Sequence, residues 1–441
     1  MDLMQKIVSL CKRRGFVYPS SDIYGGLESS YDFGPLGVEM KNNIKKAWWD
    51  ELTKFHEKIV GLDAAILMSP KVWQASGHLT AGFADELAEC KKCHKRFKLD
   101  EIKNSKCPEC GGIFGKIRKF NLMMKTFIGS VEKEASQIYL RPETCQGIYV
   151  NFENILNSMR LKIPFGVAQI GKAFRNEITP KDFIYRTREF EQMEFQWFCE
   201  PEQAPKYFDH WKTERINWYL NLGIKKENLR TIEVTEKERA HYARRQIDIE
   251  YHFPFGWQEI EGIHNRGDFD LSNHSKYSGK DLRYFDKEHD KKYFPYIIET
   301  SAGADRLLFA FLCNGYQEIK GARTKTTKAT KETEILLKLD KKIAPIKVAV
   351  LPLVRNKEGI VKKGKEVYKL LKTHFVCQYD ELGSIGRRYR RGDEAGVLYA
   401  ITIDFETLEE DDVTLRWRDT MKQERVKISD LIKVLKEKLG D

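Results

Sequence analysis

One eight-residue segment of this chain combines side chains that suit phosphate chemistry. Residues 299–306 read ETSAGADR, and the apolar run 307–312 follows at once. The small residues allow a ligand to approach the backbone, and the apolar run predicts a buried helix. An arginine at the start of such a helix is costly to desolvate unless it meets an anion, and phosphate fits its planar guanidinium best. Arg306 is therefore a candidate phosphate ligand.

A second group of chemically useful residues lies upstream, in FRNE at 174–177 and REFEQME at 188–194. If a strand ends here, Arg175 and Glu177 point to the same face, because side chains in a strand alternate with a period of two. One could then bind a phosphate and the other an exocyclic amine, while Phe190 offers a flat surface for a base. A surface ion pair and a core phenylalanine are the alternatives that the residues alone leave open.

Four cysteines are spaced as metal ligands. Cys90 and Cys93 form one CxxC pair, and Cys107 and Cys110 form another. Two such pairs can hold one tetrahedral zinc ion, and four thiolates leave no open position, so the metal would be structural. Two unrelated pairs of reduced cysteines are the alternative. His94 directly follows Cys93, which makes it a poor substitute for one of the thiolates.

Composition limits the class of protein. With 441 residues the chain is long enough for two or three domains, and its net charge of +11 favours a polyanionic partner such as nucleic acid. No stretch approaches the ~20 apolar residues of a membrane span, and the N-terminus lacks the apolar run of a secretory signal, so we expect no membrane association. Nine cysteines, an odd number, favour a reducing compartment.

Hydrophobic periodicity outlines the elements that must position these residues. We expect a charged, largely helical insertion at 202–245 and a linker rich in Lys and Thr at 320–342, followed by a small domain of alternating strands and helices. Helices are predicted over 2–14, 38–59, 358–372, 384–395 and 429–439. Strands are predicted over 64–68, 163–175, 185–198, 247–251, 257–264, 346–351, 376–381, 397–405 and 413–418.

Further motifs accompany these segments: YGG at 24–26, YDFGPLG at 31–37, LRPETCQG at 140–147, FRNEI at 174–178 and DIEY at 248–251. Taken together, the motifs resemble those of class II aminoacyl-tRNA synthetases, and within that class the homodimeric glycyl-tRNA synthetase family. The resemblance runs from about residue 3 to the end of the chain and includes the cysteine-rich segment.

The resemblance implies an α+β fold, in which helices flank the antiparallel sheet of class II synthetases. It implies a catalytic domain over 1–335, with a zinc-ribbon-like insertion at about 85–120 and a helical insertion at about 202–245. An α/β anticodon-binding domain would occupy 341–441. The implied protein is a cytoplasmic homodimer whose interface includes the helix from residue 38 and the strand before Pro70. Its substrates would be glycine, ATP with Mg²⁺ and tRNA(Gly), and it would carry structural Zn²⁺.

The resemblance also implies individual roles in ATP binding. Arg175 and Arg306 would be the catalytic residues, on the α- and γ-phosphates, while Glu177 would meet the adenine amine. Phe190 would stack on the base, and Glu259 is a candidate magnesium ligand. The full predicted ATP site is Arg175, Asn176, Glu177, Tyr185, Arg186, Arg188, Phe190, Glu259, Ile260, Gly303, Ala304, Asp305 and Arg306.

The implied glycine site centres on three glutamates, which suit an ammonium group and fill the space that a larger side chain would need. Three positions depart from the family pattern: Cys145 replaces the usual alanine, Thr300 the usual proline and Lys98 the usual arginine. The full predicted glycine site is Lys98, Glu143, Phe190, Glu191, Gln192, Met193, Glu194, Glu299, Thr300, Ser301, Ala302 and Gly303.

The predicted reaction has two steps, in which a glycyl-adenylate forms and the tRNA 3′-terminal hydroxyl then attacks it. Catalysis would rest on positioning and on charge stabilisation at phosphate. A class II relative that acts on another amino acid and a non-catalytic tRNA-binding protein of the same fold are the alternatives. In the C-terminal domain, Arg387, Arg388, Arg390 and Arg391 beside Tyr389 are candidate anticodon contacts, although four arginines in five positions cannot share one helix face.

Overall fold

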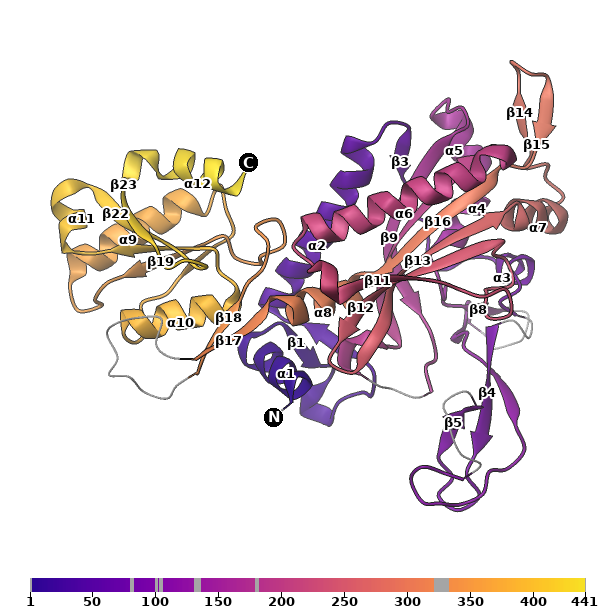
Figure 1. Ribbon diagram of the computed structural model, residues 1–441, viewed down its shortest axis with the longest axis horizontal. Coiled ribbons are helices and arrows are strands. Elements are labelled where there is room, and N and C mark those ends of the chain that lie inside the picture. Colours follow the sequence, from indigo (N-terminus) through magenta and orange to yellow (C-terminus); the bar gives the residue numbers. More distant parts are fainter. Residues whose placement is uncertain are drawn as a thin grey trace.

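The computed structural model describes residues 2–79, 83–99, 102, 106–130, 136–178, 182–320 and 333–440. Its centre is a seven-stranded sheet in the order β11-β12-β13-β16-β10-β9-β3 (Figure 1). Every neighbouring pair is antiparallel except β3 and β9, which run parallel. The bounds are β3 Ile59–Gly61, β9 Phe165–Phe174, β10 Glu189–Cys199, β11 Leu229–Glu233, β12 Arg245–Phe253, β13 Gly256–Gly267 and β16 Tyr296–Gly303.

Helices cover both faces of this sheet. The odd-numbered side chains of β10 face α2 (Pro35–Phe55), α6 (Ala204–Asn221) and α8 (Ala304–Gly315); Phe195 packs on Trp211 of α6, which lies across the sheet (Figure 1). The even-numbered side chains face α4 (Cys145–Val150) and α7 (Phe269–Ser278). The Tyr149 hydroxyl of α4 donates to Gln196 at 2.8 Å. We call the face covered by α4 and α7 the second face of the sheet. Because side chains alternate along a strand, only the even-numbered residues of β10 can reach a site on it.

The remaining elements around the seven-stranded sheet are mostly short. The predicted first helix is confirmed as α1 (Leu3–Arg14), which an Asp2 capping box begins and Gly15 ends. The other bounds are β1 Val17–Pro19, β2 Tyr31–Phe33, α3 Pro70–Ala75, β7 Lys125–Phe127, β8 Gln137–Tyr139, α5 Phe152–Ser158, β14 Tyr284–Asp286 and β15 Lys291–Tyr293. No helix within the described ranges has both the length and the apolar character required to span a membrane.

The cysteine-rich insertion, residues 84–121, is a three-stranded sheet that projects from the body (Figure 1). Its central strand is β4 (Ala84–Glu89), with β5 (Arg96–Lys98) on one side and β6 (Arg118–Asn121) on the other, both antiparallel to it. The prediction placed this insertion at about 85–120, and residues 100–101 and 103–105 of that span lie outside the described residues.

The C-terminal domain holds a mixed sheet in the order β20-β19-β21-β22-β23, in which β19 runs parallel to both of its neighbours. Four helices accompany it, which confirms the alternating pattern predicted for this part. Strand bounds are β19 Val348–Pro352, β20 Cys377–Tyr379, β21 Tyr399–Ile403, β22 Asp412–Trp417 and β23 Gln423–Lys427. Helix bounds are α9 Glu358–Leu371, α10 Ile385–Ala395, α11 Phe405–Glu410 and α12 Leu431–Leu439.

Three predictions about elements need correction. Residues 64–68 form no strand, because the Arg141 guanidinium takes the Ala64 carbonyl at 2.7 Å and replaces a strand partner; the strand after α2 is β3 instead. The predicted helical insertion at 202–245 is helical mainly in α6, and its second half supplies edge strand β11. The predicted linker is paired at its flanks, since β17 (Tyr316–Lys320) is antiparallel to β18 (Thr333–Leu337). Residues 321–332 lie outside the described residues.

Candidate active site

A cavity of about 350 Å³ opens on the second face of the sheet, where β9, β10, β13 and β16 lie side by side. This volume falls in the range of small-molecule sites, about 300–1,000 Å³. Most of the predicted site residues line it, although they are far apart in the sequence. Those lining it are Glu143, Arg175, Glu177, Tyr185, Arg186, Phe190, Gln192, Glu194, Glu259, Glu299, Ser301, Gly303, Asp305 and Arg306.

The pairing of β10 with β16 explains how distant residues meet. Gln192 lies opposite Gly303, and Glu194 lies opposite Ser301. Because side chains alternate along each strand, Phe190, Gln192 and Glu194 all point to the cavity. Phe190 and Glu194 are four residues apart, which separates their positions by about 13 Å along the strand. The cavity is therefore long enough to hold a base at one end and a small group at the other.

Arg175 and Phe190 form one end of the cavity. The Arg175 guanidinium lies 5.2 Å from the centre of the Phe190 ring, and its Nε donates to the Pro142 carbonyl at 3.1 Å. Glu177 lines the same region and is 8 % exposed. The arrangement holds a cation next to a flat aromatic surface, which suits a nucleotide.

Arg306 enters the cavity at the start of α8, as the sequence predicted. Its Nε donates to the Tyr185 carbonyl at 3.2 Å, and its guanidinium lies 4.4 Å from the centre of the Tyr185 ring. An ion pair of 3.3 Å joins it to Glu259. Tyr185 and Glu259 therefore hold the guanidinium in the cavity, where an anion could replace the carboxylate.

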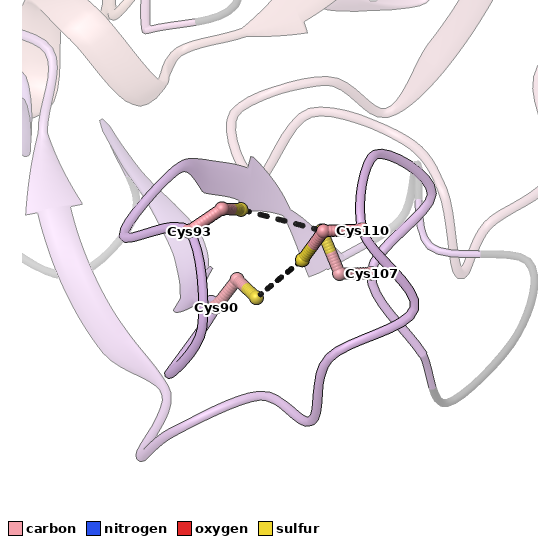
Figure 2. A group of neighbouring side chains, drawn as sticks. All are labelled: Cys90, Cys93, Cys107 and Cys110. Carbon is pink, nitrogen blue, oxygen red and sulfur yellow. Dashed lines mark hydrogen bonds between the residues drawn. The ribbon is translucent and has the colours of Figure 1, made fainter.

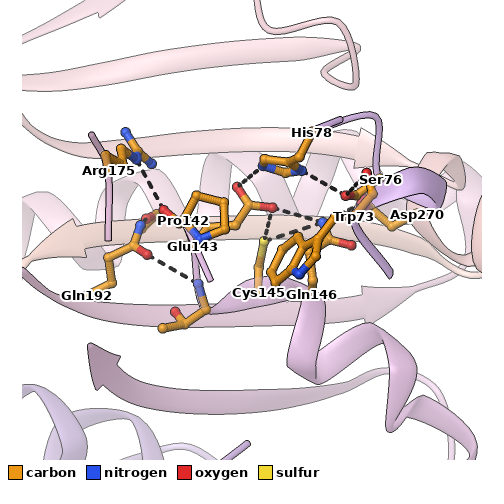
Figure 3. Close-up of polar contacts among 12 residues, drawn as sticks. Trp73, Ser76, His78, Pro142, Glu143, Cys145, Gln146, Arg175, Gln192 and Asp270 are labelled. Carbon is orange, nitrogen blue, oxygen red and sulfur yellow. Dashed lines mark hydrogen bonds and ion pairs between the residues drawn. The ribbon is translucent and has the colours of Figure 1, made fainter. Parts of the chain in front are cut away.

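Glu143, Glu194 and Glu299 converge at the other end, and we call these three residues the carboxylate pocket. Each is less than a tenth exposed. Glu143 accepts from the Gln146 amide at 2.9 Å and the Cys145 thiol at 3.1 Å, and His78 lies 3.5 Å away (Figure 3). Burial opposes ionisation of Glu143, but the neighbouring His78 keeps its pKa well below the usual range.

Glu194 and Glu299 lie close together, but their pKa values are shifted in opposite directions. Burial and the neighbouring Glu299 raise the pKa of Glu194 well above its usual range. Glu299 is just as buried, but Arg266 and His264 lower its pKa to about 2. Ser301 donates its hydroxyl to Glu194, and the Gln196 amide donates to Glu194 at 3.0 Å and to Glu299 at 2.9 Å. Without a ligand, the surroundings of Glu143 and Glu299 thus favour the ionised form, and those of Glu194 favour the protonated form.

Sequence reasoning missed several residues that build this pocket. Arg266 is 2 % exposed, contacts Glu299 at 3.0 Å and makes two hydrogen bonds to Asp270, at 2.6 and 2.9 Å. Tyr242 lines the cavity, and its ring centre lies 3.6 Å from the Arg266 guanidinium. The available signal was the spacing of His264 and Arg266, two polar residues on one face of a strand that reads as buried.

Other predicted residues do not present side chains to the cavity. On β10 and β16 they lie at the alternate positions, which face the opposite side of the sheet. Ile260 lies where the register of β13 with β12 shifts, and Ala304 is the first residue of α8. Glu191 pairs with Lys41 at 3.0 Å and Lys45 at 2.9 Å on α2. Thr300 is fully buried, and four residues belong to the hydrophobic core: Met193, Ile260, Ala302 and Ala304. Any contact between these residues and a ligand in the cavity must use the backbone.

Three further predicted residues brace the site instead of lining it. Arg188 donates to the carbonyls of Glu177 at 3.2 Å and Glu28 at 3.0 Å. The Asn176 backbone N–H donates to the Leu122 carbonyl at 2.9 Å. Lys98 forms its ion pairs with Asp85 and Glu177, and within the described ranges it forms none with the carboxylate pocket. The structure therefore places Lys98 by the Arg175 end, away from its predicted contact with glycine.

Cys90, Cys93, Cys107 and Cys110 form one group, which we call the cysteine cluster (Figure 2). Sγ of Cys90 lies 3.5 Å from that of Cys110, and Sγ of Cys93 lies 3.7 Å from that of Cys107. A tetrahedral zinc site with Zn–S bonds of about 2.3 Å requires sulfur separations of about 3.8 Å. A Cβ at Gly112 would approach Sγ of Cys90 to 2.9 Å, so the loop leaves room for the sulfurs. The donor set and its spacing therefore fit zinc.

The arginine-rich helix of the C-terminal domain is only partly available for a ligand. Arg388 is 3 % exposed and donates to the Leu353 carbonyl at 3.1 Å, which makes it part of the domain interior. Arg391 pairs with Asp380 at 2.5 Å, and Arg390 pairs with Glu334 at 3.3 Å. Arg387 is the exposed member of the group. The sequence indicated that these four arginines cannot all share one helix face, and the structure shows three of them engaged in contacts within the protein. Arg387 is therefore the best candidate for an anticodon contact.

Comparison with known proteins gives two matching family models and close full-length relatives. A model described as the tRNA synthetase class II core domain (G, H, P, S and T) matches residues 127–314, and an anticodon binding domain matches residues 347–438. A glycine–tRNA ligase of Treponema denticola is 50% identical over 442 residues, which cover 99% of this chain and 97% of the relative. Glycine–tRNA ligases of Borrelia hermsii (51% identical, 97% of this chain and 96% of the relative) and Thermobifida fusca (47%, 100% and 98%) are similar over a comparable span.

Proposed function

The chain belongs to the class II glycine–tRNA ligases, and on that premise we propose how its cavity divides the work of charging tRNA with glycine. The protein is a ligase that attaches glycine to tRNA. The observation that supports the proposal most strongly is that the two ends of the cavity carry opposite charges. Three buried carboxylates lie at one end, and Arg175 and Phe190 lie at the other.

ATP fits the end that carries the arginines. The adenine base stacks on Phe190 and offers its amine to Glu177, while Arg175 and Arg306 contact phosphate oxygens. The resemblance to class II synthetases and the lining of the cavity support this placement. Glu259 is the proposed ligand of Mg²⁺, which supplies positive charge to the phosphates when it is bound. Tyr185 orients Arg306 through its ring and its carbonyl.

Glycine fits the carboxylate pocket. Its ammonium group takes the place of the Glu194 proton and interacts with Glu143, Glu194 and Glu299, while the Ser301 hydroxyl remains hydrogen bonded to Glu194. An added methyl group on the substrate would collide with these side chains or leave a buried carboxylate unpaired. Selection of glycine by size and charge then requires no editing site.

The geometry supports a two-step reaction without a side-chain nucleophile. The glycine carboxylate attacks the α-phosphorus in line, a P–O bond forms, and pyrophosphate leaves. The 3′-terminal hydroxyl of tRNA(Gly) then attacks the carbonyl carbon of the glycyl-adenylate, loses its proton and displaces AMP. Arg175 and Arg306 stabilise charge that develops on phosphate oxygens, so catalysis rests mainly on position and electrostatics.

The remaining assignments concern the parts around the cavity. Residues 1–335 form the catalytic domain, and residues 341–441 read the anticodon, in line with the matched family model. The cysteine cluster holds one structural Zn²⁺. We also infer a cytoplasmic protein, as the resemblance implies, and a homodimer. Three exposed apolar residues support the dimer, because they lie in the two segments that the resemblance assigns to the subunit interface: Val38, Phe55 and Leu67.

Binding of a stable adenylate mimic tests the two ends of the cavity together. We expect 5′-O-(glycylsulfamoyl)adenosine to bind far more tightly than its alanyl counterpart, as measured by calorimetry. Glu194→Gln should weaken binding of the glycyl compound. Glu191→Gln should leave this binding unchanged, because its side chain lies on the opposite face of the same strand. Equal affinity for the glycyl and alanyl compounds would show that the carboxylate pocket does not select the amino acid.

A further inference from the structure

The cysteine-rich insertion reaches the active site through one side chain. Lys98, the last residue of β5, has its Nζ 2.5 Å from Asp85 Oδ2 and 3.8 Å from Glu177 Oε2. The Lys98 side chain is 12% exposed and that of Glu177 is 10% exposed, so the interaction is shielded from water. A charge pair in such surroundings is screened less than a pair on the surface.

Two cations interact with the Glu177 carboxylate: Lys98 at 3.8 Å and, beyond ion-pair distance, Arg306. Oε2 of Glu177 is buried and accepts no hydrogen bond from the residues that the structure describes. Within the described ranges, Lys98 is the cation that lies within 4 Å of this carboxylate. A buried carboxylate oxygen without a donor is costly. The Lys98 ammonium group offsets part of this cost. Because Glu177 also lines the cavity, its carboxylate remains available to a ligand.

The position of Lys98 depends on the cysteine cluster. Strand β5 pairs with β4 through only three residues, in which Leu87 lies opposite Lys98 and Glu89 lies opposite Arg96. Beyond this short ladder, the Cys90 backbone N–H donates to the Lys95 carbonyl at 2.9 Å. The first CxxC pair thus lies in the turn that joins β4 to β5. A metal bound there would fix the register of β5, and with it the place of Lys98.

A second contact keeps the base of the insertion against the same loop. The Leu122 carbonyl, just after β6, accepts from the Asn176 backbone N–H at 2.9 Å, directly beside Glu177. The Asn121 amide donates to the His78 carbonyl at 2.8 Å. The insertion therefore contacts the segment 175–177 twice, through the Asn176–Leu122 backbone hydrogen bond and through the ion pair of Lys98 with Glu177.

We infer that the cysteine-rich insertion is a positioning element of the nucleotide site, in which Lys98 fixes the Glu177 carboxylate that selects adenine. Lys98 acts through Glu177 and is not a contact of glycine. The metal of the cysteine cluster contributes by holding β5. This inference rests on the proposed role of Glu177 at the adenine amine, and it gives a physical reason for an insertion whose described residues, 84–99, 102 and 106–121, contribute no side chain to the cavity lining.

The test compares ATP with purine riboside triphosphate, which lacks the 6-amino group, in calorimetric binding and in pyrophosphate exchange. Lys98→Met keeps the length of the side chain and removes its charge. We expect it to reduce the preference for ATP over the analogue about tenfold, the factor that corresponds to ~1.4 kcal/mol, while the KM for glycine stays unchanged. The matched control is Lys95→Met, which removes an exposed lysine of the same insertion that pairs with Glu109. It should leave the preference intact.

Two further measurements separate this inference from the function on which it rests. Glu177→Gln should abolish the preference for ATP; if it does not, the proposed role of Glu177 is wrong. If Glu177→Gln abolishes the preference and Lys98→Met preserves it, only the present inference is overturned. A rise in the glycine KM of Lys98→Met would also overturn it. Zinc should be removed under conditions in which circular dichroism shows that the protein remains folded. This protein should show the same reduced preference for ATP over the analogue as Lys98→Met. An undiminished preference would contradict the role of the metal.

Discussion

Replacement of Glu194 by glutamine should affect activity and stability in different ways, because the surroundings of this residue in the free protein favour its protonated form. Burial and Glu299 raise its pKa well above the usual range. The folded chain therefore binds more protons here than the unfolded chain at every pH between the ordinary pKa of about 4.3 and the raised value. Ionisation of Glu194 in the unfolded state makes the wild-type protein less stable as the pH rises through this window.

The magnitude follows from proton linkage. One extra proton in the folded state reduces the free energy of unfolding by up to ~1.4 kcal/mol per pH unit. Glu194→Gln removes this dependence. Its stability relative to wild type should therefore rise with pH from about 4.3 up to the raised pKa of Glu194, even if the new amide mismatches one donor such as Gln196, a constant cost of about 1 kcal/mol. Denaturant melts at several pH values measure the difference.

Activity should fall in the same variant. A charge-assisted hydrogen bond contributes about 1.5–3 kcal/mol, so loss of the Glu194 carboxylate should raise the KM for glycine roughly 10- to 150-fold at pH 8. At lower pH the loss should shrink, because wild-type Glu194 must release its proton before the ammonium group can bind. Pyrophosphate exchange at saturating ATP, measured between pH 6 and pH 8, gives both values.

Glu191→Gln is the matched control on the same strand. Burial disfavours its charge, but Lys41 lowers the pKa of Glu191 below its ordinary value, so its ionised form stabilises the protein above that value and the benefit disappears as pH falls through the lowered pKa. The change should cost about 1–3 kcal/mol of stability near pH 7 and leave the KM for glycine unchanged. If Glu194→Gln keeps the wild-type KM and the wild-type pH dependence of stability, Glu194 neither holds a proton nor receives the ammonium group.

Three other predictions concern separate parts of the molecule. Arg175→Ala and Arg306→Ala should each slow adenylate formation by about 100-fold or more, since each loses a contact with developing phosphate charge. If either variant forms the adenylate at the wild-type rate in a single turnover, the role assigned to that arginine is excluded. Purified protein should contain one zinc per chain by elemental analysis, and Cys110→Ser should lose the metal and melt at a lower temperature; a zinc-free protein with unchanged melting would argue against the site. Arg387→Ala should weaken tRNA charging with little effect on pyrophosphate exchange, whereas Arg388→Ala should destabilise the C-terminal domain, since its guanidinium is buried; the reverse pattern would mean that the wrong arginine was assigned.

The sequence predicted well the elements whose residues follow one strong pattern. The apolar run after Arg306 is the buried helix α8, and the strands predicted over 163–175 and 185–198 are β9 and β10, which pair antiparallel. The paired CxxC motif brought four cysteines together as expected. In each case the information is local, because periodicity or short spacing is enough to specify the structure.

The errors arise where distant residues decide the outcome. Residues 64–68 have the composition of a strand, but Arg141, more than seventy residues away, takes the carbonyl of Ala64. The predicted glycine site included consecutive residues of β10, although only alternate ones can face the cavity. Arg266 and Asp270 were missed because their importance depends on Glu299, a partner that the fold supplies and the spacing does not reveal.

Amino-acid-dependent exchange of pyrophosphate into ATP tests the central claim most directly. The carboxylate pocket predicts exchange with glycine and at least ~100-fold weaker exchange with alanine, which corresponds to a penalty of roughly 3 kcal/mol for one methyl group beside buried carboxylates. A panel that also includes serine and threonine would show whether another small amino acid is the true substrate. Exchange that is equal with alanine, or absent with glycine, would contradict the account.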